Sequence, residues 1–281
     1  MVTNMPATVT LNNGVKMPRF GLGVLHIPDG PDIANAVKWA LEYGYRLIDT
    51  ASIYRNEQGV GEALRASQVP REDVFLTTKV WNSDQGFEST MNAFQSSLDR
   101  LGVDVIDLYL IHWPGPDPKR TLETWRALES IYLTGRGRAI GVSNFQIPHL
   151  EKLLAEVEIP PMLNQVELHP YLQQTELVNY CREHRIQIEA WRPIMQGQVH
   201  EIPTLIELAR RYRKNPVQIA LRWLLQRDIV VIPKSQDRVR IKDNTDIFDF
   251  QLEEGDLARI DALDQGHRLG PDPLTFAEDF G

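Results

Sequence analysis

The chain has 281 residues, of which 42% are hydrophobic and 24% are charged, so it has the composition of an ordinary globular protein and can bury a large core. Its formal net charge of −8 argues against a nucleic-acid partner. The single cysteine, Cys181, excludes an intrachain disulfide and a cysteine-rich zinc site, and it fits a reducing, cytoplasmic setting. The first ten residues lack the pattern of a secretory signal, and no apolar run approaches the roughly 18 residues of a membrane span, so we expect no membrane partner.

The first predicted element is a hairpin over residues 8–18, in which Asn12-Asn13-Gly14 supplies the turn. Strand and helix patterns alternate along the rest of the chain. Strands are expected at residues 20–23, 46–49, 74–80, 105–112, 139–142, 163–168, 186–191 and 229–232. Helices are expected at residues 32–43, 56–67, 87–101, 121–133, 148–157, 175–184, 203–212, 216–226 and 256–263.

This alternation predicts an α/β fold, namely a (β/α)8 TIM barrel that an N-terminal β-hairpin precedes. Several of the strands are short, continuous apolar runs, as is typical of parallel strands that are covered on both faces. A doubly wound open sheet is the alternative architecture. Because no linker or change in composition divides the chain, we expect a single domain over residues 1–281.

Ionisable side chains lie at the ends of three successive predicted strands, at Asp49, Lys79 and His112, and Tyr54 follows on the loop after the first of them. Taken singly, Asp49 could cap a turn, Lys79 could reach solvent, and His112 could be structural. In a barrel, however, the ends of the strands converge on the face that carries the chemistry. The four side chains together therefore predict a shared polar pocket.

The chemistry that this group allows is proton donation by a phenol. Tyrosine has an ordinary pKa of about 10, and a neighbouring ammonium group favours the phenolate, so we expect Lys79 to lower the pKa of Tyr54. Asp49 can hold Lys79 in place, and His112 can orient a substrate carbonyl. The result is a general acid aimed at a carbonyl oxygen, which requires a bound hydride donor as its partner.

The residues of this pocket resemble those of a known family. The sequence Asp49-Thr-Ala-Ser-Ile-Tyr54-Arg-Asn-Glu57 is similar to the aldo-keto reductase motif around the catalytic Asp and Tyr. Lys79, His112-Trp-Pro, Gly141-Val-Ser-Asn144 and Ile232-Pro-Lys-Ser235 follow in the order of that family, and the resemblance covers residues 11–268. The runs Asn164-Gln-Val-Glu-Leu-His-Pro170 and Trp191-Arg-Pro-Ile-Met-Gln-Gly197 look closest to its bacterial 2,5-diketo-D-gluconate reductase branch.

The resemblance implies a (β/α)8 barrel with a C-terminal substrate loop. It also implies an enzyme that uses NADPH to reduce aldehydes and ketones, including α-dicarbonyls and keto-sugars. It implies a catalytic tetrad in which Tyr54 is the proton donor and the other members are Asp49, Lys79 and His112. It also implies the cofactor contacts. Ser143, Asn144 and Gln165 would bind the nicotinamide carboxamide, Trp191 would stack on the ring, Lys234, Ser235 and Arg240 would hold the 2′-phosphate, and Asn244 would contact the adenine.

Two positively charged features bear on the cofactor. Lys234, Arg238, Arg240 and Lys242 form a basic cluster in an acidic chain, and arginine is suited to bidentate phosphate contacts. The alternative for this cluster is a solvated helix face. Arg192 stands where related sequences usually have Ser or Gly, and we hypothesise that it meets a cofactor phosphate directly.

By the same resemblance, Leu25, Trp81 and Trp113 would line the substrate pocket together with the tail over residues 266–273. We expect a monomer that acts on a small carbonyl substrate. A non-catalytic NADPH-binding regulatory barrel is the alternative from another functional class, and the complete set of Asp49, Tyr54, Lys79 and His112 favours the enzyme. A metal-dependent barrel hydrolase is disfavoured, and no metal is expected, because the seven histidines are scattered and form no HxH or HxxxH pair.

Overall fold

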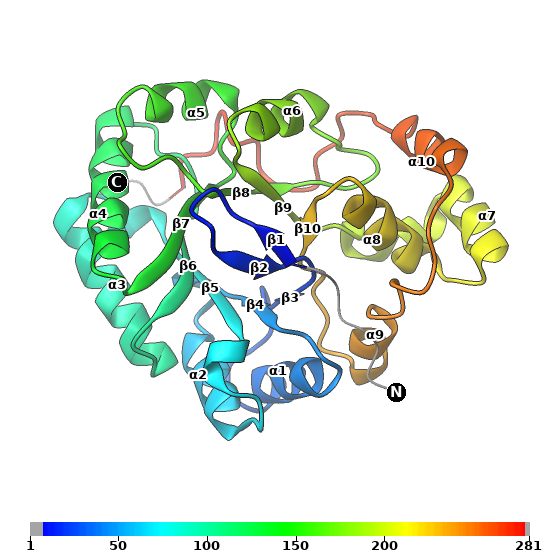
Figure 1. Cartoon of the computed structure of the whole chain (residues 1–281), viewed down its shortest axis with the longest axis horizontal. Helices are drawn as coiled ribbons and strands as arrows, with labels where there is room; N and C mark the ends of the chain where they lie inside the picture. Colours follow the sequence, from blue (N-terminus) through cyan, green and yellow to red (C-terminus); the bar gives the residue numbers. More distant parts are fainter. Residues whose placement is uncertain (1–7, 279–281) are drawn as a thin grey trace.

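The computed structural model describes residues 8–278, in which a ring of strands is surrounded by helices (Figure 1). Of the segment examined for a secretory signal, residues 1–7 lie outside the described part. The strands are β1 (Thr8–Thr10), β2 (Lys16–Pro18), β3 (Leu22–Gly23), β4 (Leu47–Asp49), β5 (Phe75–Val80), β6 (Ile106–Ile111), β7 (Gly137–Ser143), β8 (Leu163–Glu167), β9 (Gln187–Trp191) and β10 (Val230–Val231). The helices are α1 (Pro31–Glu42), α2 (Glu57–Ala66), α3 (Phe87–Leu101), α4 (Pro118–Leu133), α5 (Ile147–Leu154), α6 (Thr175–Glu183), α7 (Pro203–Tyr212), α8 (Pro216–Gln226), α9 (Arg238–Asp243) and α10 (Glu254–Asp261).

The parallel strands are arranged in chain order, from β3 to β10, and the two ends of the sheet meet. Gly21 N donates to Val231 O at 2.9 Å, and Val231 N donates to Arg19 O at 3.0 Å, so backbone hydrogen bonds close the ring. A doubly wound sheet would instead show a reversal of strand order. The structure therefore confirms the predicted (β/α)8 barrel.

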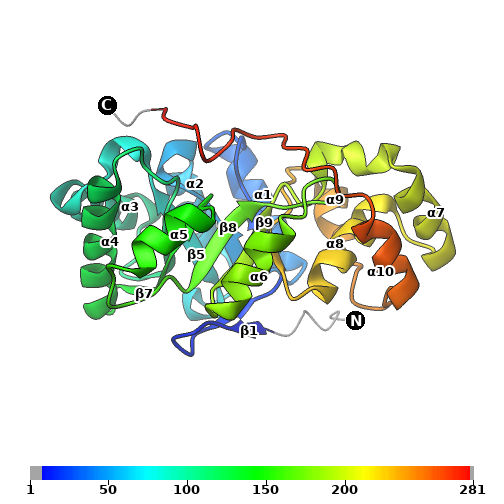
Figure 2. The same cartoon turned by 90° about the horizontal axis from the view of Figure 1, so that it is seen from above.

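The two ends of the barrel are covered differently (Figure 2). The antiparallel hairpin of β1 and β2 lies across one end, where it buries Leu11 and Met17. The C-terminal segment crosses the opposite end, above the carboxyl ends of the parallel strands. The expected hairpin thus closes one end of the barrel. The expected C-terminal loop covers the opposite end, where barrel enzymes carry their active sites.

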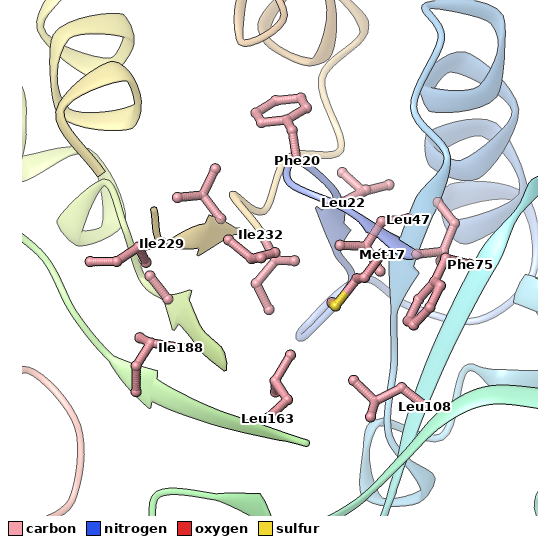
Figure 3. Close-up of a cluster of buried hydrophobic side chains, with 14 of the residues drawn as sticks. Met17, Phe20, Leu22, Leu47, Phe75, Leu108, Leu163, Ile188, Ile229 and Ile232 are labelled. Carbon is pink, nitrogen blue, oxygen red and sulfur yellow. The ribbon is translucent and has the colours of Figure 1, made fainter. Parts of the chain in front are cut away.

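Apolar side chains from the hairpin and from the parallel strands fill the interior of the barrel (Figure 3). Every residue of β5 and of β6 is buried, which agrees with the expectation that these strands are covered on both faces. The labelled members of the cluster include Met17, Phe20, Leu108, Leu163 and Ile188. This packing gives the strand ends a rigid support, so the side chains that follow the strands are held in fixed positions.

One helix, α9, is absent from the expected helices, although a helix face was the alternative given for the basic cluster that it contains. Its six residues include four charged ones, so the segment shows no apolar stripe that would predict a helix. The structure explains it by local contacts: Asp237 Oδ1 accepts from Arg240 N at 2.9 Å, and Tyr45 Oη donates to Ile241 O at 2.9 Å. The helix therefore depends on a cap and on an anchor from a distant part of the chain. No helix among residues 8–278 is long and apolar enough to cross a membrane.

Candidate active site

The four side chains expected to form a tetrad meet at the carboxyl ends of neighbouring strands. Asp49 is the last residue of β4, Lys79 lies near the end of β5, and His112 directly follows β6. Tyr54 ends a short 3-10 turn between β4 and α2. Asp49, Lys79 and His112 are buried, whereas the residue Tyr54 is half-buried.

Lys79 is held by three acceptors. Its Nζ lies 2.8 Å from Asp49 Oδ1, 2.8 Å from Asp49 Oδ2 and 2.8 Å from Thr50 O. Burial, the largest single influence, lowers the pKa of Lys79, but the charge and hydrogen bond of Asp49 together with the charges of Tyr54 and Glu189 outweigh burial and raise that pKa. The group is therefore an ammonium cation fixed inside the protein.

The phenol of Tyr54 lies next to this cation. Lys79 Nζ is 5.1 Å from the centre of the Tyr54 ring, and the ring stands edge-on to His112 with centroids 5.7 Å apart. Lys79 lowers the pKa of Tyr54, as expected, but the net shift is upward, because burial is the largest influence and Asp49 and Glu189 raise this pKa further. Tyr54 is therefore a protonated phenol at neutral pH, with its proton available for donation.

His112 is present as a neutral imidazole. Burial, with a contribution from Lys79, holds the pKa of His112 well below its ordinary value of 6.5. The Trp81 ring packs edge-on against it at 5.1 Å, and Asn144 Nδ2 donates to its backbone oxygen at 3.0 Å. A neutral imidazole between Tyr54 and Trp81 can donate a hydrogen bond to a carbonyl without adding charge to the pocket.

Residues from β7, β8 and β9 form a polar row beside the tetrad. Asn144, which has a left-handed backbone with φ 65°, follows β7 and accepts at Oδ1 from Trp191 Nε1 at 2.8 Å. Ser143 Oγ donates to the backbone oxygen of Gln165 at 2.8 Å. Gln165 Nε2 donates to Asp49 Oδ2 at 2.7 Å, which joins this row to the tetrad.

Sequence reasoning did not assign Glu189, which is fully buried in the middle of β9. Its Oε2 accepts from Gln165 Nε2 at 2.7 Å. Burial, followed by the nearby charge of Asp49, raises the pKa of Glu189 to about 8. The one signal in the sequence is a carboxylic acid between Ile188 and Ala190, in a strand that was expected to be buried.

The basic cluster separates into two parts in the structure. Arg238 pairs with Glu42 at 3.8 Å and donates to Tyr43 Oη at 3.0 Å, so its charge is already met on the protein surface. Lys234 and Arg240 form no ion pair with a carboxylate of residues 8–278. Burial and the charge of Arg240 lower the pKa of Lys234, as is typical of two cations that share one site. Ser235 and Asn244 are buried beside them.

Arg192 lies against Trp191 rather than in the basic cluster. Its Cζ is 5.3 Å from the Trp191 ring, and its Nη1 is buried without a hydrogen-bond partner among the described residues. A Cβ atom added to Gly270 of the tail would come within 3.3 Å of this Nη1. The guanidinium group therefore points to the junction of β9 and the C-terminal tail, and its contact with a cofactor phosphate stays a prediction.

The C-terminal tail is fastened across the site by a buried carboxylate. Glu167, the last residue of β8, accepts from Leu269 N at 2.7 Å and from Gly270 N at 3.0 Å, and His169 Nε2 lies 3.1 Å from the same group. Burial alone would raise the pKa of Glu167, but these hydrogen bonds outweigh it and lower that pKa. The tail is therefore anchored to the barrel by a charged group.

Aromatic residues line the space beneath the tail. Trp113 packs against Phe276 with ring centroids 4.3 Å apart, and Phe276 lies beyond residues 266–273, where the substrate tail was expected to end. Leu25 and Trp81 are half-buried. A cavity of about 650 Å³ lies between α4, α5 and residues 273–277, and none of its lining residues belongs to the tetrad. No three His, Cys, Asp or Glu side chains of residues 8–278 are grouped so that they could hold a metal ion.

The structure thus defines a parallel (β/α)8 barrel that gathers a buried ion pair, a phenol and an imidazole at the carboxyl ends of its strands. A model of the aldo/keto reductase family matches residues 20–265. Glyoxal reductase of Bacillus subtilis is 53% identical over 97% of this chain and 98% of its own length. Methylglyoxal reductase DkgA of Yersinia pestis is 46% identical over 98% of this chain and 99% of its own length. The crystal structure of a Gox0644 mutant in complex with NADPH has a TM-score of 0.91 and 40% identity, and the match covers 96% of this chain and 98% of that chain.

The chain therefore belongs to the aldo/keto reductase family, and it is an oxidoreductase that acts on carbonyl groups. Its relatives are consistent with the 2,5-diketo-D-gluconate reductase branch.

Proposed function

We propose that this protein reduces aldehydes and ketones to alcohols, with α-dicarbonyls and keto-sugars as its substrate class and Tyr54 as its proton donor. The observation that carries the proposal is the placement of the protonated Tyr54 phenol beside a cation, Lys79, which Asp49 holds through two contacts of 2.8 Å. The relatives named as glyoxal and methylglyoxal reductases support the choice of α-dicarbonyls.

NADPH is the cofactor of this family member, and the residues present fit it. Lys234 and Arg240 are cations without a carboxylate partner among the described residues, as a 2′-phosphate site requires. Ser235 would complete the phosphate contacts, and Asn244 would reach the adenine.

The polar row supplies groups for the other end of the cofactor. Both protons of Gln165 Nε2 are taken by carboxyl groups, so the carbonyl oxygen of Gln165 is available to a carboxamide N–H. Asn144 Oδ1 accepts from Trp191 and has a second lone pair, and Ser143 lies beside it. We propose that these three residues bind the carboxamide and that Trp191 stacks on the ring.

The side chains of the site then direct the proton transfer. NADPH supplies the hydride when it is bound. His112, as a neutral imidazole, donates a hydrogen bond that orients the substrate oxygen towards Tyr54. Tyr54 gives its proton to that oxygen, and Lys79 stabilises the phenolate that remains. Asp49 keeps Lys79 in place, so the cation does not have to reorganise during the reaction.

We also propose that residues 1–281 act as one barrel domain, as a monomer in the cytoplasm. The single cysteine fits the cytoplasmic setting, and the net charge of −8 opposes a nucleic-acid partner. Leu25, Trp81 and Trp113 would contact the carbonyl substrate together with the tail. Arg192 would meet a cofactor phosphate.

The experiment that tests the proposed function is NADPH consumption by the purified protein with three sets of substrates: simple aldehydes, α-dicarbonyls such as glyoxal and methylglyoxal, and keto-sugars. The highest kcat/KM is expected for an α-dicarbonyl or a keto-sugar. NADPH binding without consumption of any carbonyl would support the regulatory barrel instead. Consumption restricted to simple aldehydes would contradict the proposed substrate class.

A further inference from the structure

The carboxyl group of Glu189 is a buried ionisable group that the proposed proton transfer does not use. It is fully buried in β9 and stands in register with Gln165 on β8 and with Val230 on β10. A carboxyl group in the interior of a protein costs free energy unless it is hydrogen-bonded. Its partners therefore indicate what the group does.

The side-chain amide of Gln165 connects Glu189 to the tetrad. Gln165 Nε2 donates to Glu189 Oε2 at 2.7 Å, and it also donates to Asp49 Oδ2 at 2.7 Å. The same oxygen of Asp49 accepts from Lys79 Nζ at 2.8 Å. Because an amide nitrogen carries two protons, the two carboxyl groups account for both of them. The carbonyl oxygen is the part of the amide that stays available to a ligand.

We propose that Glu189 is a positioning residue, which fixes the side-chain amide of Gln165 so that its carbonyl oxygen faces the cofactor carboxamide and its nitrogen steadies Asp49. This inference rests on the proposed function, in which Gln165 binds the carboxamide. Without an acceptor at position 189, one carboxyl group alone would orient the amide. A half-turn of the amide would then place N–H donors against the carboxamide N–H and would leave Asp49 Oδ2 with Lys79 only.

The charge of Glu189 adds a second consequence. With a pKa of about 8, the group is mostly a neutral acid at neutral pH, and Oε1, which has no hydrogen-bond partner among residues 8–278, is the oxygen left to carry the proton. Asp49 raises the pKa of Glu189, and Lys79 lowers it. The ionised form would in turn raise the pKa of Tyr54 and weaken it as an acid. We therefore expect kcat/KM for reduction to fall as pH rises through the ionisation of Glu189.

The test compares two variants, Glu189→Gln and Glu189→Leu. In Glu189→Gln the side-chain oxygen still accepts from Gln165, but the group cannot ionise; in Glu189→Leu the acceptor is lost. In the 15N-labelled protein without cofactor, both side-chain amide protons of Gln165, assigned by their absence in Gln165→Met, should exchange slowly. One of the two protons should lose protection in Glu189→Leu, and both should keep it in Glu189→Gln.

The second readout is NADPH affinity. It should fall about tenfold in Glu189→Leu, as the loss of one hydrogen bond implies, and should stay near wild type in Glu189→Gln.

The kinetic readout is the pH profile. Wild type should lose kcat/KM as pH rises through about 8, and Glu189→Gln should show no such fall. Unchanged protection of the Gln165 amide protons together with unchanged NADPH affinity in Glu189→Leu would overturn the proposal. A fall of kcat/KM with pH that persists in Glu189→Gln would also overturn it. This second result decides the matter if Glu189→Leu does not fold. If wild type neither binds nor oxidises NADPH, the proposed function fails separately, and the exchange of the Gln165 amide protons still decides whether Glu189 holds this side chain.

Discussion

Lys79 donates to both carboxylate oxygens of Asp49 at 2.8 Å, and the same ammonium group lies 5.1 Å from the centre of the Tyr54 ring. The carboxylate thus fixes a cation beside a phenol that burial keeps protonated. This arrangement separates the two tasks of the site. In the proposed mechanism, Asp49 and Lys79 supply a fixed electrostatic environment, and Tyr54 supplies the proton.

Replacement of Lys79 by Met is expected to destabilise the fold as well as to abolish reduction. It would leave Asp49 as an unpaired buried carboxylate, and breaking a buried pair in this way typically costs about 3–5 kcal/mol. Urea denaturation measures the effect. The control is Lys38→Met, because Lys38 forms only an exposed pair with Glu42 at 3.9 Å, which is worth about 0.5 kcal/mol or less. Equal stability losses in the two variants would contradict the structural role of the buried pair.

Replacement of Arg240 by Ala is expected to weaken NADPH binding about 10- to 100-fold, as the loss of a charged hydrogen bond implies, with little effect on NADH. NADH lacks the 2′-phosphate, so the ratio of the two dissociation constants isolates this contact. Arg238→Ala is the matched control, because Arg238 already pairs with Glu42. A similar loss of affinity for both cofactors in Arg240→Ala would remove Arg240 from the phosphate site.

Replacement of Glu167 by Gln is expected to loosen the C-terminal tail. The neutral side chain keeps one carbonyl acceptor for the amides of Leu269 and Gly270 and turns an N–H towards the other. KM for carbonyl substrates should rise several-fold, and limited proteolysis should cut the tail sooner than in wild type. Glu176→Gln on the exposed face of α6 serves as the control. An uncut tail with an unchanged KM would show that Glu167 does not anchor this segment.

The stability of the fold should decrease with pH because of Glu189. Its pKa in the folded protein is raised from 4.5 to about 8, so between these values the folded state keeps a proton that the unfolded state has lost. The free energy of unfolding therefore falls as pH rises through this window and becomes constant above it. Denaturation of wild type and Glu189→Gln at a series of pH values measures the free energy of unfolding of each protein. Wild type should lose stability relative to Glu189→Gln as pH rises through this window, and a gain of stability relative to that variant would contradict the assigned ionisation.

The architecture and the tetrad positions could be predicted because they depend on local patterns. Apolar runs mark the strands, and the barrel brings their carboxyl ends together, so Asp49, Lys79 and His112 could be placed at one face from their position after each strand. The contact between Asp49 and Lys79, 30 positions apart in the chain, follows from the pairing of β4 with β5.

Other features depend on contacts that no local pattern shows. Hydrogen bonds through Gln165 link Glu189 to Asp49, and this link requires the closed ring of strands. The helix α9 depends on a hydrogen bond from Tyr45, and the tail is held by Glu167, which precedes Leu269 by 102 positions in the chain. The lowering effect of Lys79 on the pKa of Tyr54 was predicted, but the net rise was not, because burial cannot be weighed from residue types alone.

The most direct test of the account is NADPH consumption with methylglyoxal by wild type and by Tyr54→Phe, together with the NADPH affinity of both proteins. Phenylalanine keeps the ring and removes only the hydroxyl that donates the proton. Turnover should fall by at least about 10²–10⁴-fold, which is the typical contribution of a general acid, while NADPH affinity stays within a factor of about two. Turnover by Tyr54→Phe at the wild-type rate would contradict the assignment of Tyr54 as the proton donor.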